Sequence, residues 1–204
     1  MRALTWQGKR TVSVEDVPDP RIQEPTDAII RVTSTGICGS DLHLYEVLGP
    51  FMDAGDVIGH EPMGIVEEVG SAVTHIKPGD RVVIPFNISC GHCWMCERGL
   101  QSQCETTQVR EQGSGAALLG YSRLYGSVPG GQAQYLRVPH ADYGPIKVPH
   151  TAPTSSGCSS PTSSPPRGRA CSTRTSLRAT PSPCSASARS ARWPRASACT
   201  SATA

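Results

Sequence analysis

The chain has no run of apolar residues that approaches the roughly 20 needed for a membrane-spanning helix. Its N-terminal segment, Met-Arg-Ala-Leu-Thr-Trp-Gln-Gly-Lys, also lacks the long apolar core of a secretory signal. We therefore expect a cytoplasmic protein that makes no contact with membranes. Disulfides are rare in that reducing compartment, so the nine cysteines are expected to serve another purpose.

Acidic residues and lysine are missing from residues 151–204, which carry seven Arg and a net charge of +7. Residues 1–150 carry 12 Lys and Arg against 17 Asp and Glu, a net charge of −5. The overall charge of +2 therefore combines two unlike pieces and gives no support to nucleic-acid binding.

Large apolar residues are equally scarce in residues 151–204, where Leu177 and Trp193 are the only two. Fourteen Ser, ten Ala, eight Thr and seven Pro make up most of this segment. Such a composition cannot bury enough surface to offset its conformational entropy, so we expect a disordered tail. Residues 1–150 contain ample Val, Ile, Leu and Ala and are expected to form one folded domain.

Short segments rich in β-branched residues and separated by Gly, Pro and Asp recur through residues 1–150, which predicts strands. The predicted strands are 11–17, 28–33, 64–70, 81–85 and 132–138. The valines of the first strand are expected mostly on one side. Residues 105–131 contain six glycines without a clear period and predict a long loop. Closely spaced short strands favour a mainly β, antiparallel, barrel-like domain.

Cys90, Cys93, Cys96 and Cys104 form the strongest motif in the sequence. Cysteines at these short spacings can bring four sulfurs around one tetrahedral Zn²⁺. Disulfides or free thiols are the alternatives, but two-residue loops fit disulfide geometry poorly. Because four protein ligands leave no open position, the motif predicts a structural zinc site.

A second group combines Gly-Ile-Cys-Gly-Ser-Asp-Leu-His at 36–43 with Gly-His-Glu-Pro at 59–62. Cys38 supplies a thiolate and His60 an imidazole, and either one alone would be an ordinary core or loop residue. Together they suit a catalytic zinc that keeps one position for water or substrate. The polar side chains nearby in the sequence are Ser40, Asp41, His43 and Glu61.

These motifs continue in order with Val-Glu-Glu-Val-Gly, Gly-Asp-Arg-Val, the four-cysteine cluster and Gly-Gly-Gln-Ala-Gln-Tyr-Leu-Arg-Val-Pro. In this order they resemble the medium-chain zinc-dependent alcohol dehydrogenases. The resemblance covers about residues 1–150 and implies the GroES-like catalytic domain of that family. The segment after residue 150 shows no such likeness.

The resemblance implies the following roles around the catalytic zinc. Cys38 and His60 would be two of its ligands, and Glu61 an outer or exchanging ligand. Asp41 would accept a hydrogen bond from the ring N–H of His60 and so hold its tautomer.

Two further roles concern the substrate, a small-molecule alcohol. Ser40 would hydrogen-bond the alcohol hydroxyl, and His43 could pass its proton onward. Zinc would stabilise the alkoxide as a Lewis acid, and hydride would pass to NAD(P)⁺. Members of the family are homo-oligomers.

Three parts that the resemblance implies are not readable in the sequence. These are a third zinc ligand, usually Cys or Asp, a Rossmann domain with Gly-x-Gly-x-x-Gly, and a C-terminal return to the catalytic domain. We therefore expect this chain to be inactive as a dehydrogenase, although the family is enzymatic.

The composition of residues 151–204 is what a GC-rich gene yields when it is read out of frame. After a one-base shift, residues 181–194 permit Val-Ala-Val-Leu-Gly-Leu-Gly-Pro-Ile-Gly-Gln-Met-Ala, which has the glycine spacing of the dinucleotide fingerprint. The same shift permits Asp at Pro161-Thr162, where the family expects its third ligand. We interpret the chain as truncated or frame-shifted after about residue 150. A genuine low-complexity extension is the alternative.

Two other functional classes remain open. The chain could be a non-catalytic zinc-binding module that acts by association, with the basic tail as an interaction arm. It could also be a zinc-ribbon that binds nucleic acid, but a ribbon needs neither Gly-His-Glu nor Gly-Ser-Asp-Leu-His. Production of reduced NAD(P) from alcohols would distinguish the enzyme from both.

Overall fold

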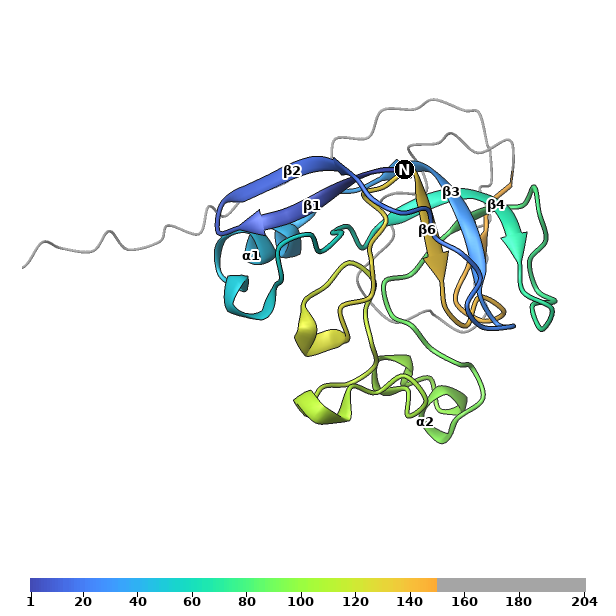
Figure 1. Cartoon of the computed structure of the whole chain (residues 1–204). Helices are drawn as coiled ribbons and strands as arrows, with labels where there is room; N and C mark the ends of the chain where they lie inside the picture. Colours follow the sequence, from blue (N-terminus) through green and yellow to red (C-terminus); the bar gives the residue numbers. More distant parts are fainter. Residues whose placement is uncertain (150–204) are drawn as a thin grey trace, which may run out of the picture. The chain divides into compact units, whose positions relative to one another are not determined.

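The computed structural model describes residues 1–149, so every expectation for residues 151–204 lies outside the described residues. Two antiparallel sheets are present (Figure 1). In the smaller one, β1 (Arg2–Gly8) pairs with β2 (Thr11–Asp16). The larger sheet has five strands in the order β6-β3-β4-β5-β7. Their bounds are Ala28–Thr35 for β3, Pro62–Val69 for β4, Arg81–Val83 for β5, Tyr135–Val138 for β6 and Ile146–Lys147 for β7.

Strand β1 links the two sheets. Isolated antiparallel bridges join Ala3 to Ala133, just before β6, and Thr5 to Val57, before β4. Strand pairing therefore continues from one sheet to the other around the core. The mainly β, antiparallel, barrel-like class is confirmed for the described residues.

Each of the five predicted strands is present, and β1 and β7 are additional. Strand β2 differs from the others because its valines are exposed: Val12 is 36% exposed and Val14 is 63% exposed. The valines of this strand thus form an outer surface of the described part and add nothing to the core.

The main core lies on the five-stranded sheet. Ile30, Val66, Val82 and Leu136 come from four adjacent strands and are at most 2% exposed. Burying an aliphatic side chain of this size contributes about 1.5–3 kcal/mol, so this cluster accounts for much of the driving force for folding. It also anchors the strand ends from which the functional loops begin.

Helical segments are short. The α-helices are α1 (Gly39–Glu46) and α2 (Trp94–Glu97), and the 3-10 turns are η1 (Gly49–Phe51), η2 (Gln101–Gln103), η3 (Arg110–Gln112) and η4 (Arg123–Tyr125). The predicted loop at 105–131 thus contains two turns of 3-10 helix. In Figure 1 the green segment with α2 lies apart from the strands. None of the described helices has the length and hydropathy required to cross a membrane.

Candidate metal centres

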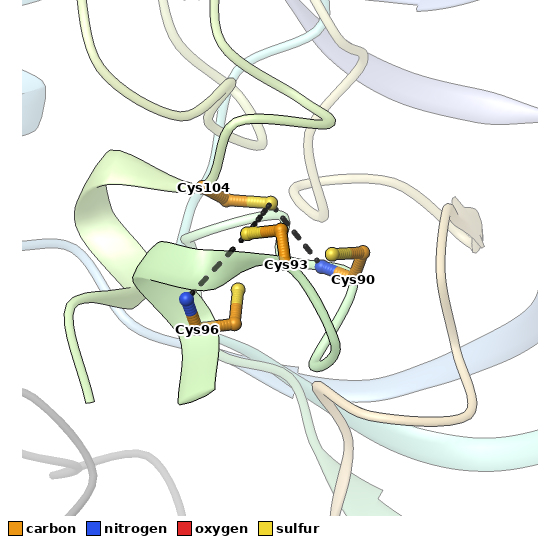
Figure 2. A group of neighbouring side chains, drawn as sticks. All are labelled: Cys90, Cys93, Cys96 and Cys104. Carbon is orange, nitrogen blue, oxygen red and sulfur yellow. Dashed lines mark hydrogen bonds between the residues drawn. The ribbon is translucent and has the colours of Figure 1, made fainter. Parts of the chain in front are cut away.

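The four cysteines predicted to bind zinc lie together (Figure 2). Cys93 caps the N-terminus of α2, Cys96 lies within α2, and Cys104 ends η2. Cys90 precedes them in an extended segment. All four Sγ atoms lie within 4.8 Å of one another. Among the described residues, no His, Asp, Glu or further Cys belongs to this group.

Polar hydrogens point at the sulfurs of this cluster. The backbone N–H of Cys90 donates to Cys104 Sγ at 3.4 Å, and the backbone N–H of Cys96 donates to Cys93 Sγ at 3.5 Å. The hydroxyl of Thr106 donates to Cys90 Sγ at 3.2 Å. Donors of this kind stabilise thiolates, which are the form of cysteine that binds metal.

Two thiols of the cluster, those of Cys96 and Cys104, have pKa values shifted in opposite directions. Burial opposes ionisation of Cys104, but hydrogen bonds from Thr107 and Cys90 outweigh it and lower its pKa to about 6. Burial raises the pKa of Cys96 to about 12, and the adjacent Cys93 and Cys104 raise it further. Thiols packed this closely cannot all ionise unless a cation compensates their charge.

The sulfur positions fit zinc. Four sulfurs at a Zn–S distance of about 2.3 Å would lie about 3.8 Å apart in a tetrahedron. The sulfurs of Cys93 and Cys104 are 3.9 Å apart. The donor set, its spacing and its pKa pattern are therefore all compatible with a closed, four-coordinate zinc site.

The second group forms at the start of α1. Cys38 is the N-cap of this helix, and its Sγ accepts the backbone N–H of Ser40 at 3.3 Å. Asp41, in the first turn, accepts the backbone N–H of Cys38 at 2.8 Å and completes a capping box. His60 comes from the segment before β4, and its Nε2 lies 3.0 Å from Cys38 Sγ. Residues 22 positions apart in sequence thus meet.

The arrangement of Asp41 behind His60 suits an imidazole that ligates through Nε2. His60 Nδ1 lies 3.5 Å from Asp41 Oδ1, and neither buried atom has a hydrogen-bond partner. His60 is 2% exposed and Asp41 is 6% exposed. A carboxylate against the far ring nitrogen is the usual support for a metal-ligating histidine. The sulfur, imidazole and carboxylate atoms all lie within 4.8 Å of one another and are compatible with a metal.

The remaining residues predicted for this site lie around this group. Ser40 is half-buried beside Cys38, and His43 is exposed in the last turn of α1. Glu61 does not belong to the group of close ligand atoms, because its carboxylate is turned against Gly36. A Cβ on Gly36 would lie 2.4 Å from Glu61 Oε2. The roles of Ser40, His43 and Glu61 therefore stay predictions.

Two aromatic residues that the sequence did not indicate also border the site. The ring of Tyr121 lies 4.9 Å from the ring of His60, and the ring of Phe86 lies 6.2 Å from it, edge to face. Burial raises the pKa of Tyr121, and a side-chain hydrogen bond with Ser40 opposes this increase only in part. Nothing in the local sequence marks Tyr121, since it lies in the glycine-rich segment and belongs to none of the motifs described above.

Comparison with known proteins agrees with this arrangement. The family model described as alcohol dehydrogenase GroES-like domain matches residues 24–149. An uncharacterized zinc-type alcohol dehydrogenase-like protein of Bacillus subtilis is 56% identical over 151 residues, which are 74% of this chain and 39% of that protein.

Solved structures show the same similarity. The alcohol dehydrogenase of Thermus sp. ATN1 has a TM-score of 0.65 and 42% identity, over 73% of this chain and 40% of that one. An Escherichia coli alcohol dehydrogenase complexed with NADH has a TM-score of 0.58 and 28% identity, over 78% of this chain and 41% of that one. The chain thus spans about 40% of the length of each of these three proteins.

Proposed function

The chain belongs to the alcohol dehydrogenase family with a GroES-like domain, and we propose that residues 1–150 are the zinc-binding catalytic domain of an NAD(P)-linked alcohol oxidoreductase. One observation carries the proposal. A cysteine sulfur and an imidazole from distant segments, Cys38 and His60, meet at 3.0 Å with a buried carboxylate behind the imidazole. A zinc-binding module without catalysis would need only the four-cysteine cluster.

The four-cysteine cluster is proposed to hold a structural zinc. The buried cysteines of this cluster take the place of a hydrophobic core in this segment. Among the described residues, Ala116 is the one other buried apolar residue that packs with them. A bound cation would neutralise the closely packed thiolates and join α2 to η2. This role requires thiols that stay reduced, which agrees with the proposed cytoplasmic location.

Each residue of the second group has a proposed role in alcohol oxidation. Cys38 and His60 would hold a zinc ion, and Asp41 would keep the proton on His60 Nδ1. Bound there, zinc would supply Lewis-acid polarisation of the alcohol oxygen. The hydroxyl of Ser40 would accept the alcohol proton, and the exposed His43 would pass a proton to solvent. Glu61 would be an outer or exchanging ligand.

Hydride acceptance needs a part that the described residues do not contain. The dinucleotide-binding fingerprint is not found in the sequence as written, and the third zinc ligand that the family resemblance implies is not readable in it. Without a bound nicotinamide the reaction loses a proximity contribution of about 7–11 kcal/mol. We therefore propose that this 204-residue chain does not itself oxidise alcohols. A frame shift after about residue 150 remains our explanation for the missing parts.

Two gene products test this proposal. The chain as written, supplied with zinc, NAD⁺ or NADP⁺ and a panel of small alcohols, is expected to produce no reduced cofactor. A one-base correction near codons 149–153 is expected to restore the glycine fingerprint and an acidic ligand, and with them alcohol oxidation. Cys38→Ala, His60→Ala and Ser40→Ala should each abolish that activity. Turnover by the uncorrected chain, or a stop codon soon after the correction, would contradict us.

Metal analysis tests the structural site separately. The purified chain is expected to contain about one tightly bound zinc per molecule, because within residues 1–149 only the cysteine cluster offers four protein ligands. Cys104→Ser should remove most of this metal, whereas Cys38→Ser should leave it in place. A metal-free protein with four reactive thiols would refute the structural zinc but not the catalytic assignment.

A further inference from the structure

Cys93 differs from the other thiols of the four-cysteine cluster in its exposure. Cys93 is half-buried, whereas Cys90, Cys96 and Cys104 are buried, and Cys104 is fully inaccessible. A dissolved oxidant reacts with a thiolate that it can reach. Cys93 is therefore the sulfur of this cluster that meets such an oxidant first.

The sulfur of Cys104 is in position to react with an oxidised Cys93. The two Sγ atoms are 3.9 Å apart, and a disulfide needs about 2.05 Å, so they must approach by about 2 Å. The two residues belong to different segments, the start of α2 and the end of η2, and can move toward each other.

Cys96 is a less suitable partner for Cys93. Both residues lie in one helical turn, where Cys93 Sγ accepts the backbone N–H of Cys96 at 3.5 Å and caps α2. A bond between these two sulfurs would turn Cys93 Sγ away from this N–H and leave the start of the helix without its cap. The cap on α2 thus favours Cys104 over Cys96 as the partner of Cys93.

We propose that the four-cysteine cluster is an oxidative modification site for peroxides, in which Cys93 is oxidised first and Cys104 then closes a disulfide with loss of zinc. The thiolate of Cys93 attacks hydrogen peroxide, the S–O bond forms as the O–O bond breaks, and hydroxide leaves. The thiolate of Cys104 then attacks the sulfenic sulfur, and a second hydroxide leaves. Two electrons pass from the sulfurs to the peroxide.

Loss of zinc follows from the change in ligands, and this step rests on the proposed structural zinc. Two of four thiolates become a disulfide, which does not serve as an anionic ligand, so only Cys90 and Cys96 remain. Cys38 is half-buried as well, but its group contains no second thiol among the described residues. Oxidation of Cys38 should therefore stop before any disulfide within its group.

Hydrogen peroxide applied to the full, zinc-containing chain tests the proposal. Zinc content is measured first, release is followed with a metallochromic dye, and the product is digested with trypsin. Cys90, Cys93 and Cys96 share the tryptic peptide 82–98, whereas Cys104 lies in 99–110. We expect zinc release together with a covalent link between these two peptides. Trapping of sulfenic acid with dimedone at early times is expected at Cys93.

Two ligand-matched variants complete the test, since each leaves three thiolates. Cys93→Ser should lose the link between the peptides and should release its zinc on the order of tenfold more slowly. Cys96→Ser should still form the link. A disulfide confined to peptide 82–98, a link to a cysteine beyond residue 150, or early trapping at another cysteine would overturn the proposal. A chain without zinc at the outset would refute the zinc site, and the peptide map would still decide the disulfide.

Discussion

The carboxylate of Asp41 interacts with two neighbours at once. One oxygen accepts the backbone N–H of Cys38 at 2.8 Å and caps α1, while the other faces His60 Nδ1 at 3.5 Å. Because Asp41 is only 6% exposed, water cannot easily replace either interaction. A single residue thus connects the first turn of α1 with the imidazole that comes from the segment before β4.

Replacing Asp41 by Ala is expected to lower the free energy of unfolding by about 1–3 kcal/mol. The substitution removes the helix cap and leaves a partly buried N–H without an acceptor. Urea denaturation of both proteins measures the difference. Glu67→Gln is the control, since Glu67 pairs with Arg31 at exposed positions and should contribute less than about 0.5 kcal/mol. An equal loss in both variants would contradict the capping role of Asp41.

At the scale of elements, three loops meet backbone to backbone next to the second metal group. A Cβ on Gly120 would lie 2.3 Å from the carbonyl oxygen of Gly59, and a Cβ on Gly130 would lie 2.4 Å from the same oxygen. These loops can approach only because side chains are absent at the contacts. The approach brings Tyr121, next to Gly120, against the ring of His60.

Comparing Gly120→Ala with Gly113→Ala separates the free-energy cost of disturbing this close loop contact from the cost of the left-handed backbone conformation. Both glycines have a φ of +64°, but a Cβ on Gly113 would have no atom within 4 Å. Gly113→Ala is expected to cost about 1–2 kcal/mol for the left-handed conformation alone. Gly120→Ala should cost at least about 2 kcal/mol more, because the loops must separate. Chemical denaturation gives both values, and equal losses would show that the close contact is unimportant.

The carboxylate of Asp142 fastens the turn after β6 to the loop before β5. It accepts the backbone N–H of His75 at 2.6 Å and that of Thr74 at 2.5 Å. These backbone donors hold the pKa of Asp142 below its usual value. Because the pKa is lower in the folded state, this contribution to stability is present above the unfolded pKa of about 3.9 and is lost as the pH falls.

Asp142→Asn should therefore reduce the pH dependence of stability in acid. The wild-type chain is expected to lose stability as the pH falls below about 4, and the variant should lose less over the same interval. Denaturation midpoints measured between about pH 6 and pH 3 provide the comparison. The exposed Glu67→Gln serves again as the control. Parallel curves for wild type and Asp142→Asn would refute the effect.

At the scale of the whole molecule, several apolar side chains on and around α1 are exposed in the described part of the chain. Ile37 is 74% exposed, Leu42 62%, Val47 60% and Phe51 40%. The matched proteins are more than twice as long as the part that they share with this chain. Clustered exposed apolar surface of this kind promotes self-association when nothing else covers it.

The double variant Leu42→Ser with Val47→Thr is expected to reduce concentration-dependent self-association. Sedimentation velocity over a range of concentrations measures it. Val14→Thr is a matched control, because Val14 is 63% exposed but lies on β2 and not on α1. If both changes reduce association to the same degree, the α1 surface has no special part in it.

Features that depend on local spacing could be predicted from the amino-acid sequence alone. Four cysteines within 15 residues can meet around one metal whatever surrounds them, so this group was predictable. The β-branched segments predicted the positions of five strands for the same reason, since alternation and turn residues act over a few positions. The pairing of Cys38 with His60 was proposed from their residue types, and the family resemblance then gave each its expected role.

Features that depend on contacts between distant segments became visible only in the folded chain. β1 was not predicted, because it is stabilised by pairing with β2 and by bridges to Val57 and Ala133. Tyr121 reaches His60 only because loops without side chains pack together at Gly59 and Gly120. The turned carboxylate of Glu61 and the partial exposure of Cys93 are likewise results of packing. Local sequence patterns cannot predict such contacts, because they join residues that are far apart in the chain.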